Sequence, residues 1–160
     1  MGISLCLDFG NTRLKVAVFN GRDFQEEINL PEATVESITA LMNQWKPKKV
    51  ILSSVINHDP AIESIMAEQT AFHQLSHASL LPLTTPVGKP ETIGADRLAL
   101  VAAAVDLFPK QHNLVIGLGT CITYNFINNQ HEFLGGSISP GMNMRFRAMH
   151  EQTALLPYIK

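Results

Sequence analysis

One arrangement of residues occurs twice in this chain, and the repeat restricts the folds that the chain can adopt. Residues 5–12 form an apolar segment that leads into a glycine turn with a threonine, and residues 114–121 repeat that order. A second apolar segment follows in both places. Repeated supersecondary units indicate a duplicated fold. Because strand–turn–strand units are common, a chance match is the alternative.

The apolar spacing along the chain predicts alternating strands and helices, an α/β pattern. Strands are expected at residues 3–8, 14–19, 24–30, 50–55, 114–116 and 121–127, and helices at 34–45, 59–68, 94–108 and 141–152. Glycines predict a turn at residues 117–120 and a loop at 135–141, prolines predict a surface loop at 82–90, and residues 75–85 are expected to be part strand and part loop.

The charge balance and the cysteines restrict the class of partner and the compartment. The 160 residues carry a net charge of -2 and no basic run, so the electrostatic footprint of a nucleic-acid-binding protein is missing. No apolar stretch is long enough to cross a membrane. Cys6 and Cys121 lie in apolar segments, as buried thiols of a reducing cytoplasm do. We therefore expect a cytoplasmic protein with a small-molecule partner, and neither a nucleic acid nor a membrane partner.

The first polar turn carries groups suited to phosphate and metal. Asp8 ends the first predicted strand and can hold magnesium, directly or through water. Asn11, Thr12 and the local amides can meet phosphate oxygens, and Lys15 can offset charge on a departing phosphoryl group. The alternative is a hairpin turn whose Asp and Asn side chains only satisfy their own backbone.

A second group of polar residues opens the helix after the proline loop. Asp96 lies in the first helical turn, next to Arg97, so the helix dipole and the guanidinium both favour the ionised carboxylate. Such a carboxylate can take the proton of a substrate hydroxyl, while Arg97 can bind an anionic part of the acceptor. The alternative is ordinary complementation of a helix start.

The glycine segment at residues 135–141 is the third motif. It lets the backbone come close to a flat ligand and then begins a helix, as an adenine or ribose pocket requires. The alternative is that these glycines and the proline only turn the chain.

These three motifs and Gly119-Thr120, taken in this order, resemble the type III pantothenate kinases of bacteria. The resemblance implies an α/β protein with the duplicated actin-like (ribonuclease H-like) fold of the acetate and sugar kinases, Hsp70 and actin, built from mixed sheets with flanking helices. Residues 1–112 would form an N-terminal lobe, and residues 113–160 a C-terminal lobe that is incomplete, since members of the family are longer.

The resemblance also implies an activity, ATP-dependent phosphorylation of pantothenate to 4′-phosphopantothenate, the first step of coenzyme A biosynthesis. The cofactors would be ATP, Mg²⁺ and a monovalent cation, K⁺ or NH₄⁺. The protein would be a homodimer that takes pantothenate as its small-molecule substrate.

Position by position, the resemblance makes Asp96 the catalytic base and residues 8–15 the first phosphate loop, and its carboxylate at a strand end makes Asp8 the candidate magnesium ligand. The substrate-binding residues would be Gly94, Ala95, Asp96 and Arg97. The ATP-binding residues would be Asp8, Phe9, Gly10, Asn11, Thr12, Arg13, Leu14, Lys15, Thr120, Gly135 and Gly136.

Three positions depart from the family pattern. Gly117 stands where the family has the aspartate that binds the monovalent cation, and Asn125 stands where a further acid is common. Val87 falls near the family's aromatic residue in the acceptor pocket. These departures and the length leave open a non-catalytic relative that acts as a ligand-binding or transcription accessory protein, and another sugar or acid kinase of the superfamily is a third possibility.

Overall fold

The computed structural model describes residues 2–159, which form two compact units. The first unit holds the chain as far as Ser79 together with Gly94–Asp96. The second holds Leu80–Ile93 and the chain from Arg97 onward. Among residues 2–159, no helix is long and apolar enough to cross a membrane.

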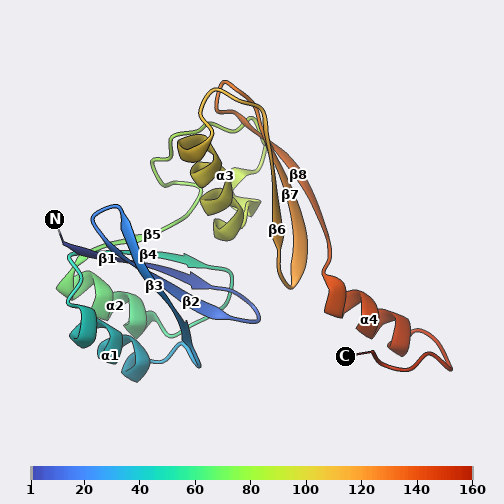
Figure 1. Ribbon diagram of the computed structural model, residues 1–160, viewed down its shortest axis with the longest axis horizontal. Coiled ribbons are helices and arrows are strands. Elements are labelled where there is room, and N and C mark those ends of the chain that lie inside the picture. Colours follow the sequence, from blue (N-terminus) through green and yellow to red (C-terminus); the bar gives the residue numbers. More distant parts are fainter. Residues whose placement is uncertain (1, 160) are drawn as a thin grey trace. The chain divides into compact units, whose positions relative to one another are not determined.

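A five-stranded sheet in the order β3-β2-β1-β4-β5 forms the centre of the first unit (Figure 1). Its strands are β1 (Ile3–Phe9), β2 (Leu14–Asn20), β3 (Asp23–Leu30), β4 (Lys49–Ser54) and β5 (Ala71–Gln74). The first three are antiparallel neighbours, whereas β4 runs parallel to both β1 and β5. This is the strand order of a ribonuclease H-like sheet, as the resemblance implies.

Two helices, α1 (Val35–Trp45) and α2 (Pro60–Gln69), cover one face of this sheet (Figure 1). Thr34 caps α1 in a reciprocal capping box with Ser37, and Asp59 caps α2 ahead of a proline that suits the first turn. The core between sheet and helices consists of Leu5, Leu7, Phe9, Val16, Val18, Ile38, Leu41, Met42, Val50, Leu52, Ile62 and Met66. Each fully buried aliphatic side chain contributes about 1.5–3 kcal/mol.

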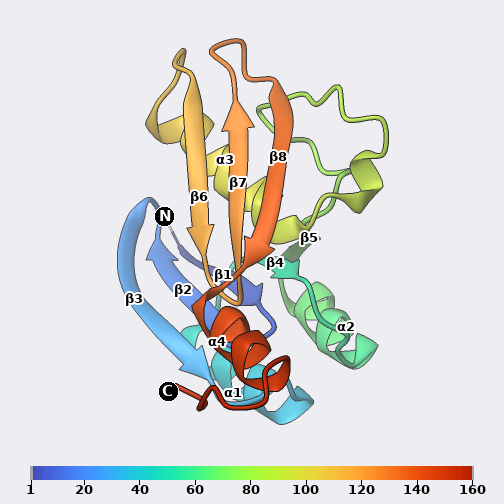
Figure 2. The same ribbon diagram turned by 90° about the vertical axis from the view of Figure 1, so that its right-hand side faces the viewer.

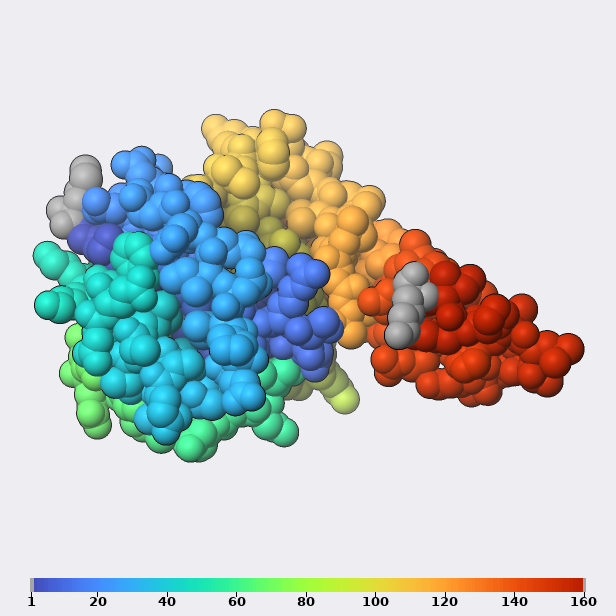
Figure 3. Space-filling view, turned by 60° about the horizontal axis from the view of Figure 1, so that its bottom comes forward, coloured from blue at the N-terminus to red at the C-terminus, as the bar shows by residue number. Residues whose placement is uncertain are grey.

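Strand alternation decides which side chains are left on the other face. Leu5, Leu7 and Phe9 are buried on the helix side, so Cys6 and Asp8 point to the face opposite α1 and α2. The edge strand β3 is largely exposed and lies on the surface of the unit (Figure 3).

The second unit contains an antiparallel sheet in the order β6-β7-β8 (Figure 2). Its strands are β6 (Asn113–Leu118), β7 (Cys121–Ile127) and β8 (Phe133–Pro140). Its helices are the short η1 (Pro90–Thr92), α4 (Met142–Glu151) and α3 (Ala95–Leu107), of which Ala95 and Asp96 belong to the first unit. Val101, Ala104 and Val105 of α3 pack on Ile127 and Phe133 of the sheet.

The two units share a local topology that extends the repeat in the sequence. In the first, the meander β1-β2-β3 is followed by α1, and in the second the meander β6-β7-β8 is followed by α4. The predicted lobes at residues 1–112 and 113–160 stay a prediction.

Three local expectations are wrong. Gly117 lies within β6, so the turn is confined to residues 119–120, and Gly135 and Gly136 lie within β8 rather than in a loop. Glycine is common in turns, but at Gly117 and Gly136 neighbouring atoms come too close for a side chain, and Gly135 has a φ of 102°, which favours glycine. The strand β5 was missed, and residues 75–85 contain only a bridge from Thr84 to Glu132.

Candidate active site

Asp8 lies in a row of polar side chains across three strands of the first unit. It pairs with Lys15 of β2 and with Ser53 of β4. Directly paired residues of neighbouring strands present their side chains to the same face. The row Lys15, Asp8, Ser53 therefore lies on the face that α1 and α2 leave uncovered.

Asp96 belongs to the same unit, and Gly94, two residues before it, lies beside the chain that follows β4. A Cβ atom added at Gly94 would lie 2.5 Å from Oδ1 of Asp96 and 3.9 Å from Cγ1 of Val55. Val55 in turn donates its backbone N–H to the carbonyl of Phe9, at the end of β1. The carboxylate of Asp96 thus lies close to Gly94.

The charges of Asp8 and Asp96 act on each other. Burial raises the pKa of the Asp8 carboxyl, the Asp96 carboxylate raises that pKa further, and Lys15 lowers it. Nζ of Lys15 also lies 3.8 Å from Oε1 of Glu27, so the ammonium group interacts with Glu27 as well as with Asp8. The carboxylate of Asp96 therefore lies close enough to Asp8 for its charge to act on that carboxyl, although the two residues are distant in sequence.

This site suits a magnesium ion that is completed by phosphate and water. Residues 2–159 contain no group of three or more His, Cys, Asp or Glu side chains that could hold a metal by itself. Mg²⁺ is commonly bound by one or two carboxylates, with the remaining ligands from water and substrate phosphates. The net negative charge at Asp8 fits such an ion.

Arg97 is tied down within the second unit. Its Nε donates to Oδ1 of Asn125 at 2.6 Å, and its Nη2 donates to the carbonyl of Tyr124 at 3.3 Å. The guanidinium carbon lies 5.6 Å from the ring centre of Phe133. Arg97 is thus anchored by neutral acceptors and an aromatic face.

The position expected to bind a monovalent cation has no side-chain ligand. A Cβ atom at Gly117 would lie 2.7 Å from Oγ1 of Thr123 and 2.9 Å from Cδ1 of Leu100, so the space of a ligand side chain is filled. Asn125 is fully buried and donates to Thr123 and to the carbonyl of Val115. These residues do not fit a cation held by aspartate at this position.

Comparisons with known proteins identify the family. The family model described as type III pantothenate kinase matches residues 4–160. The chain belongs to the type III pantothenate kinase family. It is 39% identical over 159 residues to the type III pantothenate kinase of Christiangramia forsetii, with 98% of this chain and 65% of that protein covered. It is 37% identical over 159 residues to that of Flavobacterium johnsoniae, with 97% of this chain and 64% of that protein covered. The chain thus spans less than two thirds of these relatives' length.

A solved structure supports the fold of this pantothenate kinase family member. The Ppx/GppA phosphatase of Aquifex aeolicus matches with a TM-score of 0.50 and 13% identity, covering 95% of this chain and 55% of that one. At this identity the likeness concerns the fold alone. Together with the strand orders it confirms the predicted α/β, actin-like class.

Residues 8–15, which are expected to bind phosphate, form a tight hairpin between β1 and β2. Gly10 donates its N–H to the carbonyl of Arg13 at 3.1 Å, which closes the turn between β1 and β2. Phe9 is fully buried and Leu14 packs against the core. The exposed side chains of this segment are those of Asp8, Asn11, Thr12 and Arg13. Nucleotide binding by residues 8–15 stays a prediction.

The turn at Gly119-Thr120 and the glycine segment at residues 135–141 contain closely packed backbone. The carbonyl of Thr120 accepts the N–H of Gly141 at 3.0 Å, where α4 begins. Gly135 has a φ of 102°, which favours glycine, and a Cβ atom at Gly136 would lie 1.8 Å from the carbonyl oxygen of Tyr124. A structural need therefore accounts for both glycines, and their contact with ATP, like that of Thr120, stays a prediction.

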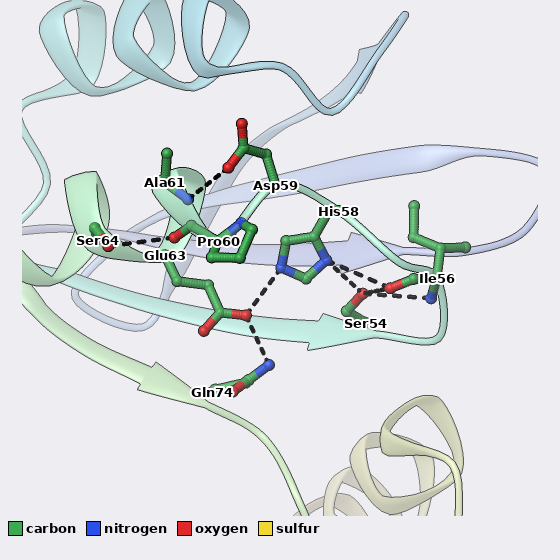
Figure 4. Close-up of polar contacts among 9 residues, drawn as sticks. All are labelled: Ser54, Ile56, His58, Asp59, Pro60, Ala61, Glu63, Ser64 and Gln74. Carbon is green, nitrogen blue, oxygen red and sulfur yellow. Dashed lines mark hydrogen bonds and ion pairs between the residues drawn. The ribbon is translucent and has the colours of Figure 1, made fainter.

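A polar network that the sequence did not reveal holds the chain after β4 (Figure 4). His58 Nε2 lies 2.9 Å from Oε1 of Glu63, which also accepts from Gln74 at 2.8 Å, and His58 Nδ1 lies 3.2 Å from Oγ of Ser54. A serine, a histidine and a carboxylate can form a nucleophilic triad, but here Ser54 donates to the carbonyl of Ile56 within its own turn. We interpret the network as a support for the segment after β4, which includes Val55 and lies beside Gly94.

Ser53 is the residue of the site that sequence reasoning missed. The available signal was the pair Ser53-Ser54, which ends the apolar run of β4. The pairing of Ser53 with Asp8 depends on a parallel register between strands distant in sequence. That register could not be read from either segment alone.

Proposed function

We propose that the protein to which this chain belongs transfers the γ-phosphoryl group of ATP to pantothenate, giving 4′-phosphopantothenate, the first step of coenzyme A biosynthesis. Membership of the family supports the reaction class. The observation that carries the proposal is the pair of carboxylates, Asp8 and Asp96, whose charges act on each other within the first unit.

The two carboxylates have different tasks in this proposal. Asp96, in the first turn of α3, accepts the proton of the pantothenate hydroxyl as that oxygen attacks phosphorus. Asp8, at the end of β1, holds Mg²⁺, and Lys15 beside it offsets phosphate charge. Magnesium-bound ATP supplies the phosphoryl group and the neutralising charge. Gly94 and Ala95 carry Asp96 to the acceptor, and Arg97 orients the acceptor's anionic end.

We also propose that a monovalent cation is not required at the family position. Gly117 offers no side-chain ligand, and Leu100 and Thr123 fill the space beside it. Initial rates with K⁺, NH₄⁺ or a large organic cation as the only monovalent ion should therefore agree within about twofold. A strict requirement for K⁺ would contradict this point.

The resemblance further supports a homodimer that works in the cytoplasm. Light scattering coupled to size-exclusion chromatography measures the first property directly. A monomer that phosphorylates pantothenate at all protein concentrations would overturn the dimer and leave the reaction standing.

The reaction is tested by measuring ADP release from ATP with and without pantothenate. We expect pantothenate-dependent release, and a loss of about 10²–10⁴-fold in Asp96→Asn. Asp106→Asn is the matched control, because Asp106 is an exposed carboxylate on the same helix. Folded protein without any pantothenate-dependent release would favour the non-catalytic alternative, and release with another acid or sugar would favour a different kinase of the superfamily.

A further inference from the structure

The hydroxyl of Ser53 has no hydrogen-bond partner within the described part of the chain. The residue is 8% exposed, and its Oγ atom is buried. A buried hydroxyl left without a partner costs about 1–3 kcal/mol. Native proteins rarely retain such a group unless water or a ligand satisfies it. The structure therefore calls for a partner that is not part of residues 2–159.

The position of this hydroxyl restricts what the partner can be. Ser53 pairs with Asp8 and shares its face of the sheet, away from α1 and α2. Its neighbour Ser54 points to the other face, where its own hydroxyl is bonded to the carbonyl of Ile56. Ser53 thus lies beside the carboxylate of Asp8, which the proposed function assigns to Mg²⁺. The group expected beside Asp8 is a hydrated cation.

We infer that Ser53 is a positioning residue of this site, whose hydroxyl hydrogen-bonds the hydration shell of the divalent cation held at Asp8. This inference rests on the proposed function. Mg²⁺ keeps several of its waters when it binds protein and phosphate, and those waters need acceptors. A hydroxyl accepts such a bond without adding negative charge beside Asp8 and Asp96. Partners of this kind orient the metal's ligands, and their loss typically costs about 10–100-fold in metal affinity or activity.

Three substitutions separate the hydroxyl from the shape of the side chain. Ser53→Ala removes the hydroxyl and leaves little space. Ser53→Thr and Ser53→Val have nearly the same shape and differ in a hydroxyl against a methyl group. Ser4→Ala is the control, because Ser4 lies on the same face near the other end of β1.

The readout is the affinity for Mn²⁺, measured by electron paramagnetic resonance in the presence of a non-hydrolysable ATP analogue. We expect the dissociation constant to rise about tenfold in Ser53→Ala and Ser53→Val, and to stay within about twofold of the parent in Ser53→Thr and Ser4→Ala. Without ligands, Ser53→Ala should be at least as stable as the parent, because it removes a buried hydroxyl that lacks a partner.

The outcomes distinguish this inference from the proposed function. Equal Mn²⁺ affinity in the parent and Ser53→Ala, with pantothenate-dependent ADP release intact in the parent, would overturn the role of Ser53 alone. A parent that binds no Mn²⁺ with the ATP analogue would overturn both. Lower stability of unliganded Ser53→Ala with unchanged Mn²⁺ affinity would assign the hydroxyl to a structural water and would also overturn the inference.

Discussion

Replacing Gly136 with alanine should cause one of the largest single-methyl losses of stability in this chain. The new Cβ atom would lie 1.8 Å from the carbonyl oxygen of Tyr124 and 3.2 Å from Cα of Asn125, both backbone atoms of β7. No side-chain rotation relieves such a contact, so β8 must move away from β7 locally. Losing two or three ladder hydrogen bonds at about 0.5–1.5 kcal/mol each, with about 1–3 kcal/mol of steric strain, predicts a loss of about 2–7 kcal/mol, with about 4 kcal/mol in the middle of that range.

For a chain of this length, a loss of about 4 kcal/mol lowers the melting temperature by about 8–16 °C. Circular dichroism measures the transition, and hydrogen exchange at the amides of β7 and β8 shows whether the strands have separated. Gly88→Ala and Gly119→Ala are controls: a Cβ atom at Gly88 meets nothing within 4 Å, and at Gly119 its nearest contact is 3.8 Å. If Gly136→Ala melts within about 1 °C of Gly88→Ala, the argument for close backbone approach is refuted.

Four further substitutions test the charges and buried polar groups. Asp8→Asn should raise the melting temperature by about 1–2 °C at neutral pH, after allowing for solvent screening. Because folding raises the pKa of Asp8, the stabilising contribution of this carboxyl is complete in acid and is lost as pH rises through the folded pKa. The gain from Asp8→Asn should therefore vanish below the ordinary aspartate pKa. Asn125→Leu should cost about 2–4 kcal/mol in chemical denaturation by leaving Nε of Arg97 without its acceptor, whereas a small change would contradict that bond. His58→Ala should cost about 1–3 kcal/mol and Glu63→Gln clearly less, since the amide keeps the acceptor oxygen, and the reverse order would count against the network.

Much of the fold could be predicted because local signals agreed with tertiary structure. Thr34 and Asp59 cap α1 and α2, and in the sequence each of these polar residues comes just before apolar residues at helical intervals. Lys46 ends α1 with a φ of 45°, just before a proline. The strand β5 was not predictable in this way, because Ala71–Gln74 is short and mostly exposed and is set by its parallel pairing with β4.

Glycine gave the wrong signal where tertiary contacts decided its use. Gly117 and Gly136 were expected in a turn and a loop, yet both lie in strands because a neighbouring side chain or carbonyl occupies the place of a Cβ atom. The sequence contains the glycines but not the identity of those neighbours.

The candidate site was predictable in its parts and not in its assembly. Asp8 at a strand end and Asp96 at a helix start were both identified from local pattern. Their mutual electrostatic effect follows only from the packing of Gly94–Asp96 into the first unit. Ser53 lies beside Asp8 because β4 pairs with β1, and the sequence of neither strand predicts that pairing.

The most direct test of this shared acidic site is the pKa of the Asp8 carboxyl, followed by carbon-13 NMR of labelled protein in the parent and in Asp96→Asn. Removing the Asp96 charge should move the pKa of Asp8 toward its ordinary value, with the remaining elevation due to burial. An Asp8 titration that is identical in the two proteins would place the carboxylates in separate environments and contradict the assignment of both to one phosphoryl-transfer site.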